Sequence, residues 1–500
     1  MDSAPSAPYA GLDQDLAVDV AVVGGGIAGL CTAWELAKSG RQVAVLEAGR
    51  IAAGVTGNTT AKVTALHTLI YDSLAQKHGP QTAAMYARSQ QDAIEHIVAT
   101  VAALGIDCDL ERLPAYTYTG QQDQVEKIRA EAEAAARAGL AASFVTETGL
   151  PFPVAAAVRV DEQAQFHPRR YLLAIAQAIT ANGGQIFEHT RITGLDEGTP
   201  CRLTTETGTT VTAADVVVAT HYPVFDRAML FTRLVPHREL VIAAPVPASA
   251  DPAGMYITPD GNTRSVRTSP YAGGQRLLIV TGESFTPGEG DVTSRYEALR
   301  AWARDRFGVT EPAYRWAAQD NRTSDQIPYI GPLHAGAEHT WVAAGFGGWG
   351  MTNAVVASRL IAESLAGRPP QWAGIYDPRR LKVLAEAGPV LKAQAQVVKH
   401  FVGDRLRRAP VGTPAELAPG QAAVMRVQGE RCAVYRDQDG TLHAVSATCT
   451  HLGCLVAFND AETAWECPCH GSRFAVDGTV IQGPANRPLP PQPLNDTATA

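Results

Sequence analysis

The hydrophobic pattern of the chain changes along its length and divides it into parts. An apolar run from Val18 to Val23 is followed by a glycine-rich turn, a helical run from Ile27 to about Lys38, and a second apolar run from Gln42 to Leu46. Helical and strand-like segments then alternate, and from about residue 411 the predicted strands are short and separated by turns. The pattern predicts a mixed α/β unit followed by a small all-β unit.

Composition and charge fit a globular protein of several domains. The chain has 500 residues, 46% hydrophobic and 18% charged, with a net charge of -8, and its length suggests about three domains. An acidic balance gives no indication of a nucleic-acid partner. The first residues lack a basic segment followed by an apolar one, and no apolar run reaches the roughly 18 residues of a membrane span. We therefore expect a cytoplasmic protein without a transmembrane segment.

The N-terminal glycines have the order that a dinucleotide-binding turn requires. They form G-x-G-x-x-G between a predicted strand and a predicted helix, and an acidic residue ends the next strand. In such a turn the backbone approaches a pyrophosphate at the helix N-terminus, and the acid accepts a hydrogen bond from the ribose. We expect the cofactor to contact Gly24, Gly26, Ile27, Ala28, Gly29, Glu47 and Ala48.

A second glycine cluster occurs at residues 345–350, before a helical run from Thr352 to Leu365. That helical run leads into Gly367-Arg368-Pro369-Pro370, with no second strand and no acid. The unit is therefore incomplete as a second dinucleotide site. We interpret it as a glycine loop that touches a flavin ring.

These motifs and the run Asp325-Gln326-Ile327-Pro328-Tyr329-Ile330-Gly331 resemble the D-amino acid oxidase and glycine/sarcosine oxidase superfamily of FAD enzymes. The resemblance covers about residues 18–366. It implies an α/β fold, with a Rossmann-like FAD-binding domain and an inserted mixed-sheet substrate domain at roughly 223–312. The oxidoreductase part is then expected at 18–375, after an N-terminal tail at 1–17.

The same resemblance implies further contacts to FAD. They come from the loop at 57–62, from one residue at about 192 and from the second glycine cluster, and the residues are Thr59, Thr60, Ala61, Lys62, Ile192, Gly345, Gly347, Gly348, Trp349, Gly350 and Met351. Some relatives attach the flavin covalently to a histidine of this loop. Asn58 stands near that position, so we expect noncovalent FAD.

The residues before Asp325 bear on the substrate. Amino acid oxidases of the superfamily often carry an arginine there, which binds the substrate carboxylate. Asp320 is nearest that position and suits a cationic amine, whereas a shift of one or two residues places Arg322 there. Asp320 fits a structural turn equally well. The catalytic candidates are Asp320, Arg322 and Arg238, with His237 and Arg267 as weaker ones.

Four of the eight cysteines lie within 21 positions near the C-terminus. Cys449 and His451 form one box, Cys467 and His470 a second, with 15 residues between them. Cys/His pairs of this kind also suit zinc. The two boxes resemble the Rieske 2Fe-2S domain, in which each loop gives one Cys and one His. The resemblance implies that these four residues bind the metal.

The Rieske resemblance also implies a disulfide and a redox property. Cys454 and Cys469 match the disulfide that joins the two loops in high-potential members. Ser472 matches a hydroxyl that donates toward a bridging sulfide, whereas Phe474 stands where respiratory members have a tyrosine. Losing that hydrogen bond predicts a lower potential. The domain is expected at 411–493, after a basic helical connector at 376–410 and before a tail at 494–500.

A chain with both cofactors couples two-electron and one-electron chemistry. We expect it to oxidise the C–N bond of an amine or amino acid by hydride transfer to FAD. Electrons would pass singly to the cluster and on to a carrier protein or quinone. In one alternative the cluster feeds electrons to FAD, for imine reduction or oxygen activation. In another the protein is a non-enzymatic redox sensor.

Overall fold

The computed structural model describes residues 4, 5, 8–225, 227–380, 395, 401 and 413–494. The expected connector at 376–410 lies largely outside the described residues, as do its basic side chains, Lys399, His400, Arg405, Arg407 and Arg408. The predicted boundaries near 375 and 411 therefore stay predictions.

The first sheet follows the dinucleotide-binding pattern. Its strands run in the order β16-β17-β10-β1-β2-β7, with β9 and β8 added beside β10, and β17, β10, β1, β2 and β7 are parallel neighbours. The apolar run of β1 is central, and its last four residues are buried. The strands are β1 (Leu16–Val23), β2 (Val43–Leu46), β7 (Gln185–Phe187), β8 (Ile192–Asp196), β9 (Cys201–Thr205), β10 (Thr210–Val218), β16 (Tyr329–Pro332) and β17 (Thr340–Ala344).

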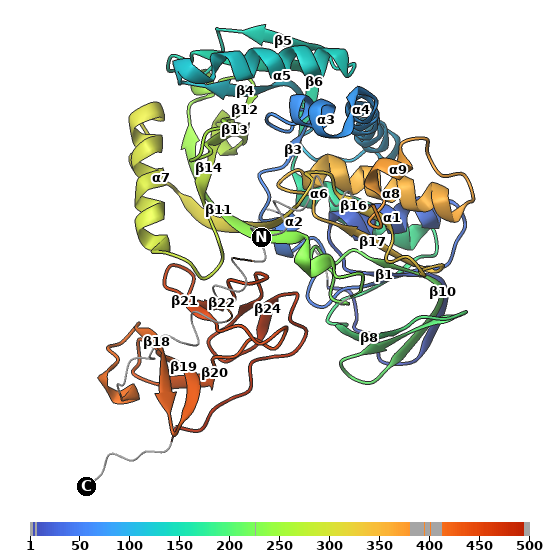
Figure 1. Cartoon of the computed structure of the whole chain (residues 1–500), viewed down its shortest axis with the longest axis vertical. Coiled ribbons are helices and arrows are strands. Elements are labelled where there is room, and N and C mark those ends of the chain that lie inside the picture. The colour runs from blue at the N-terminus through green and yellow to red at the C-terminus, as the bar shows by residue number, and fades with distance from the viewer. Residues whose placement is uncertain are drawn as a thin grey trace.

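Helices pack on this sheet and beside it (Figure 1). α1 contacts both α6 and α8. α6 begins with a proline, and the His167 side chain accepts a hydrogen bond from the Arg170 backbone N–H, so local signals fix its start. The helices are α1 (Ile27–Lys38), α2 (Gly54–Gly57), α3 (Tyr71–His78), α4 (Pro80–Leu104), α5 (Val125–Arg137), α6 (Pro168–Ala181), α7 (Val292–Phe307), α8 (Gly350–Leu365) and α9 (Ala373–Tyr376). Among the described residues, no helix combines the length and apolar character that crossing a membrane requires.

The second sheet has the strand order β15-β11-β14-β13-β12-β4-β6-β3, with β5 beside β6. Its neighbours are antiparallel apart from β4 and β12, which makes it a mixed sheet. The strands are β3 (Lys62–Val63), β4 (Glu111–Thr119), β5 (Ala142–Val145), β6 (Ala156–Gln165), β11 (Leu234–Val246), β12 (Met255–Ile257), β13 (Ser265–Pro270), β14 (Arg276–Phe285) and β15 (Tyr314–Thr323).

This second sheet extends beyond the insert expected at roughly 223–312. That segment supplies β11 to β14, but β3, β4, β5 and β6 come from residues 62–165, and β15 follows at 314–323. The parallel pairing of β4 with β12 joins the two contributions. The second sheet is therefore assembled from two separate parts of the chain.

The C-terminal part is all β and lies against the rest of the chain (Figure 1). It has a three-stranded sheet, β18-β19-β20, and a four-stranded sheet, β21-β22-β23-β24. In Figure 1, β21, β22 and β24 lie nearest the other domains, and β18 to β20 lie farther away. The strands are β18 (Ala422–Val427), β19 (Glu430–Arg436), β20 (Leu442–Ser446), β21 (Ala457–Asn459), β22 (Ala464–Glu466), β23 (Arg473–Phe474) and β24 (Val480–Gln482).

Candidate functional site

The glycines of the first turn are required by close backbone packing. Gly24 has φ +107°, and a Cβ there would lie 2.6 Å from the Ala219 carbonyl oxygen. A Cβ on Gly29 would lie 1.8 Å from the Gly24 carbonyl oxygen, so only glycine lets α1 approach the turn. Gly26 is the N-cap of α1 and lines a cavity that opens beside this turn. The N-terminus of α1 is therefore open to a phosphate.

Glu47 stands at the other side of this turn. Its carboxylate accepts hydrogen bonds from the backbone N–H groups of Gly25 and Gly49, each at 2.7 Å. Burial raises the pKa of Glu47, although these two N–H groups act in the opposite direction. Glu47 and Ala48 line the same cavity as Gly26, and so does Ile192. A carboxylate at this edge fits an adenosine ribose, and the turn fits a pyrophosphate.

The cavity has a volume of about 490 Å³ and continues from this turn toward the second sheet. Thr59, Thr60, Gly348, Gly350 and Met351 line that continuation, as the resemblance to FAD enzymes implies. A cavity lined along its length by a phosphate turn, a ribose-binding acid and a glycine loop fits an extended dinucleotide such as FAD.

Other predicted FAD contacts lie away from the cavity lining. Gly29 packs α1 on β1, and Gly345 packs against the side chains of Thr323 and Leu234. Lys62 is buried in the second sheet, where its Nζ donates to the Tyr256 carbonyl oxygen, 2.7 Å away. The cavity lining also excludes Ala61, Gly347 and Trp349. These residues pack behind the residues that line the cavity and do not line it themselves.

Trp349 has a partner that the sequence did not indicate. Its ring stacks on the His67 imidazole, with centroids 4.5 Å apart. Burial lowers the pKa of His67 to about 3, so the imidazole is neutral, and Tyr86 and the Thr64 carbonyl oxygen hold its two nitrogens. The stack anchors the second glycine loop from outside the cavity.

Asp320 also holds the second glycine loop, through a hydrogen bond. Its carboxylate accepts hydrogen bonds from the backbone N–H groups of Gly348, at 2.5 Å, and Asn321, at 2.6 Å. The His221 imidazole Nε2 lies 3.2 Å from it. Burial alone would raise the pKa of Asp320, but His221 and the other neighbours leave it lowered. Asp320 is thus an ionised group at the cavity that also positions the glycine loop.

Residues of β11 line the cavity on the side of the second sheet. His237, Glu239 and Val241, which alternate along the strand, all line it, as the two-residue period of a strand requires. Burial lowers the pKa of His237 to about 3, and its Nδ1 has no hydrogen-bond partner among the described residues. Burial raises the pKa of Glu239, whereas Arg322 and Lys62 act in the opposite direction. This wall offers one neutral imidazole and one carboxylate to a ligand.

The arginines predicted to be catalytic are placed differently. Arg322 is 55% exposed, and its Nη2 lies 3.7 Å from a carboxylate oxygen of Glu239. Arg238 also borders the cavity, but it is 1% exposed and is paired with Glu462 and Glu466 of the C-terminal part. The structure therefore gives Arg238, one of the catalytic candidates, two carboxylate partners in the C-terminal part. Arg267 is buried in β13.

The Cys/His boxes form two similar loops that meet. In each loop a glycine N–H donates back to the cysteine carbonyl oxygen, Gly453 to Cys449 at 3.0 Å and Gly471 to Cys467 at 2.9 Å. The imidazole rings of His451 and His470 lie with centroids 4.9 Å apart. Each has a buried Nδ1 that lacks a hydrogen-bond partner among the described residues.

The donor set of this site is two sulfurs and two imidazole nitrogens. Cys449 and Cys467 are buried free thiols, whereas Cys454 and Cys469 form a disulfide across the two loops. The Cys467 sulfur lies within 4.8 Å of both disulfide sulfurs. Buried thiols and unpartnered imidazole nitrogens fit a Rieske cluster, and also fit a Cys₂His₂ zinc ion.

Comparison with known families decides between these metals. Residues 19–364 match the family DAO, FAD dependent oxidoreductase, and residues 407–493 match the Rieske [2Fe-2S] domain. The chain belongs to this family of FAD-dependent oxidoreductases and carries a Rieske domain at its C-terminus. Its cofactors are FAD and a 2Fe-2S cluster, as the sequence indicated.

Two individual relatives cover 97% and 72% of the chain. The chain is 35% identical over 487 residues to YhfW of Bacillus subtilis (strain 168), a Rieske 2Fe-2S iron-sulfur protein by name, with 97% of this chain and 95% of that protein covered. It is 28% identical to gamma-glutamylputrescine oxidoreductase of Escherichia coli (strain K12), over 72% of this chain and 86% of that protein. The fold is similar to glycine oxidase from Geobacillus kaustophilus, with a TM-score of 0.61, 20% identity, and 73% and 99% of the two chains covered. These comparisons confirm the predicted superfamily and fold class.

The cavity is shared between the domains. Residues 480–483, Ala485 and Asn486 of the Rieske domain line it together with the FAD cradle. Neither this contribution nor the cavity positions of Glu239 and His221 were predicted from the sequence. The position of His221 after an apolar strand was a usable signal, because ligands bind beyond the carboxyl ends of parallel strands.

Proposed function

We propose that the protein is an FAD-dependent dehydrogenase of cationic amines that passes electrons to its own Rieske cluster. The observation that carries this proposal is the single cavity in which the FAD cradle, two carboxylates and a wall of the Rieske domain meet. The hydrogen of the amine's α C–H bond would leave as a hydride to bound FAD, and water would hydrolyse the resulting imine. A Rieske cluster carries one electron at a time, so electrons leave singly, to a carrier protein or quinone.

The charges around the cavity support an amine in preference to a free amino acid. Glu239 and Asp320 both line the cavity. Arg238 is engaged by two carboxylates, and Arg322 is more than half exposed. A carboxylate on the substrate would therefore meet two acids, whereas an ammonium would be attracted by them. The relative named for gamma-glutamylputrescine supports an amine substrate as well.

Each polar side chain has a separate part in this proposal. Glu239 attracts the substrate ammonium, and the neutral His237 presents its unpartnered Nδ1 to a polar group. Asp320 holds the Gly348 loop at the end of the cavity that fits the flavin. We propose the cytoplasm as the compartment because Cys31, Cys108, Cys201 and Cys432 are unpaired thiols.

Anaerobic mixing of the purified protein with amines and amino acids tests this function. Flavin absorbance and the EPR signal of the reduced cluster are followed in the same samples. We expect cationic amines to bleach the flavin and then produce the cluster signal. If dithionite reduces both centres while every amine leaves them oxidised, the proposal fails, and flow from the cluster to FAD becomes the better explanation.

A further inference from the structure

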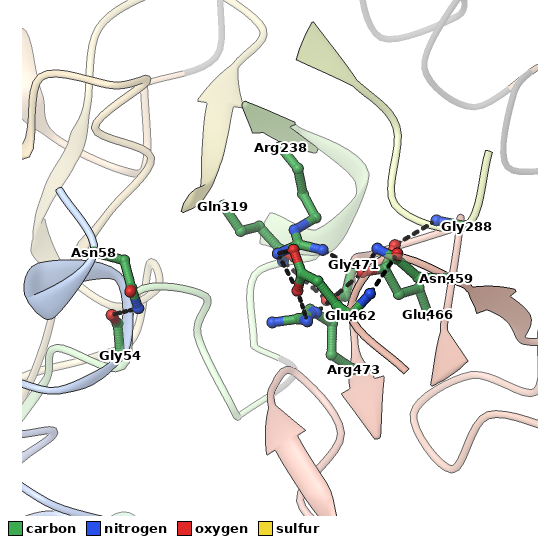
Figure 2. Close-up of polar contacts among 10 residues, drawn as sticks. All are labelled: Gly54, Asn58, Arg238, Gly288, Gln319, Asn459, Glu462, Glu466, Gly471 and Arg473. Atoms are coloured by element: carbon green, nitrogen blue, oxygen red, sulfur yellow. Dashed lines mark hydrogen bonds and ion pairs between the residues drawn. The ribbon is translucent and has the colours of Figure 1, made fainter. Parts of the chain in front are cut away.

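The Rieske domain and the FAD-binding part share a buried cluster of four charges. We call Arg238, Glu462, Glu466 and Arg473 the interdomain charge cluster (Figure 2). Arg238 Nη2 donates to both carboxylate oxygens of Glu462, at 2.9 and 2.8 Å, and its Nη1 donates to Glu466. Arg473 donates to the same two glutamates, to Glu466 at 3.1 Å. Each carboxylate is therefore held by an arginine from each side of the interface.

The charges balance only when the domains are together. Within the Rieske domain the cluster has two carboxylates and one arginine, a net charge of -1, and Arg238 of β11 supplies the missing positive charge. Arg238 and Glu466 are almost completely buried, with side chains 1% and 0% exposed. A buried charge that loses its partner is strongly destabilising. In the folded chain, the contact of Arg238 with Glu462 and Glu466 is therefore strongly favoured over an unpaired state.

The backbones approach closely around the charge cluster. The Gly288 N–H donates to Glu466 at 2.9 Å, and a Cβ on Gly288 would lie 3.0 Å from the Glu466 carbonyl oxygen. Gln319 Nε2 donates to the Gly471 carbonyl oxygen at 2.8 Å (Figure 2). A Cβ on Gly471 would lie 2.5 Å from that Gln319 nitrogen and 2.8 Å from Pro236 Cβ. The two surfaces are therefore in direct contact at glycines.

Strand register explains why one pair of strands serves both sides. Arg238 of β11 is the cross-strand partner of Gln319 on β15, and the side chains of both bond to the Rieske domain where it borders the cavity. The next pair, His237 and Asp320, lines the cavity without such bonds to the Rieske domain. At Arg238 and Gln319 this β11–β15 pair is therefore a wall that borders the cavity and also bonds to the Rieske domain.

The histidine side of the metal site faces the same interface. His470 is 2% exposed, and its ring lies 5.8 Å from that of Phe231 and 6.3 Å from that of Tyr222. The His451 ring also lies 6.3 Å from Tyr222. The His470 imidazole is therefore covered by the chain's own FAD-binding part, and the half-buried His451 ring lies beside it.

We propose that the interdomain charge cluster fixes the Rieske domain on the β11–β15 wall, with Arg238 as the positioning residue that docks it. The Rieske domain is then a permanent side of the cavity and not a mobile carrier. This arrangement concerns the placement of the domain, so it holds for either direction of electron flow. It does not depend on the identity of the substrate.

Hydrogen–deuterium exchange of the full-length holoprotein tests this docking, with Arg238→Met as the main variant. The matched control is Arg264→Met, which removes another buried arginine, one that directly precedes β13 and is paired with Glu283 of β14. Amides around Gly288 and in residues 466–474 should exchange on the order of 100-fold faster in the Arg238 variant, because the buried carboxylates lose their partner. The control should leave those amides unchanged.

Two further variants separate docking from a general loss of stability. Glu462→Gln alone weakens the contact from the Rieske side and should give the same pattern. Combined with Arg238→Met it leaves Glu466 paired with Arg473 and restores charge balance, so exchange should move back toward the wild-type rate. Flavin and cluster spectra of each variant verify loading, and after photoreduction of the flavin the cluster should be reduced more slowly in Arg238→Met.

Three results would overturn the proposal. They are wild-type exchange at Gly288 in Arg238→Met, an equal increase in Arg264→Met, or a double variant that exchanges faster than either single one. If Arg238→Met does not retain its cofactors, the Glu462→Gln variant alone decides. A failure of amines to reduce the flavin would count against the proposed function and leave these exchange results unaffected.

Discussion

Replacing Glu239 by Gln should weaken the binding of cationic amines without disturbing the fold. The Glu239 carboxylate lines the cavity with its side chain 26% exposed, and Arg322 lies 3.7 Å away. Because Arg322 is itself 55% exposed, solvent screens most of their attraction. Glu239 therefore remains available to an ammonium, and Gln keeps its size while removing its charge.

The expected magnitude follows from the loss of one charge-assisted hydrogen bond. Such a bond contributes roughly 1.5–3 kcal/mol. Since Glu239 is partly exposed and shares its charge with Arg322, we expect the lower part of that range, an increase in Kd of roughly 10- to 30-fold. Anaerobic titration of flavin absorbance with a cationic amine measures it. The control is Glu111→Gln, a carboxylate of the same sheet that is paired with Arg276 and lies outside the cavity lining.

The pH dependence of the same titration provides a second test of the role of Glu239. Burial raises the pKa of Glu239, so its carboxylate should become protonated at a pH above the usual range of a glutamate. Amine affinity of the wild type should therefore fall as pH is lowered through that pKa, and this acid limb should vanish in Glu239→Gln. Equal losses of affinity for amines and for amino acids, or no loss for either, would refute the role of Glu239.

Three further predictions concern the cluster, the flavin and stability. Phe474→Tyr should raise the reduction potential in protein-film voltammetry, because the new hydroxyl can donate to a cysteine sulfur; an unchanged potential contradicts this. Acid precipitation should leave a colourless pellet and a yellow supernatant, because the Asn58 amide cannot carry a covalent flavin; a yellow pellet contradicts this. Burial raises the pKa of the Glu131 carboxyl group to about 7 from 4.5. The stabilisation of the folded state by protonated Glu131 is therefore complete below about pH 4.5 and is lost as pH rises through about 7. Relative to wild type, Glu131→Gln should thus gain about 3 kcal/mol between pH 4 and pH 8 in denaturant unfolding; a constant difference rejects the raised pKa.

Elements with strong local signals were predictable from the sequence. The helix at Ile27–Lys38 has the predicted bounds, because a glycine turn marks its start. The second sheet was predicted too small. Its strands at Glu111–Thr119 and Ala156–Gln165 belong to a sheet whose other strands lie far along the chain, and no local pattern reports such pairing.

The residues of the candidate site also fall into two groups, those that a local motif predicts and those that only the fold brings to the cavity. The candidate metal ligands and the glycine turn are short motifs with fixed spacing, so the sequence alone predicts them. Glu239 belongs to no motif and faces the cavity only because of the register of β11. Asp320 was recognised as a candidate, but its hydrogen bond to Gly348 joins residues 28 positions apart and required the fold.

Arg238 shows why an isolated charged residue is ambiguous in a sequence. It borders the cavity together with its neighbours His237 and Glu239, and a one-residue change of register would turn its guanidinium to the other face of the sheet. The partner that decides its role, Glu466, lies 228 positions away in another domain. An arginine that is buried against carboxylates is not available to bind a substrate anion. In the proposed docking, the contact of Arg238 with Glu462 and Glu466 therefore also keeps this guanidinium from binding a carboxylate in the cavity. The two proposals, docking of the Rieske domain and preference for a cationic substrate, thus predict linked effects of one side chain, Arg238.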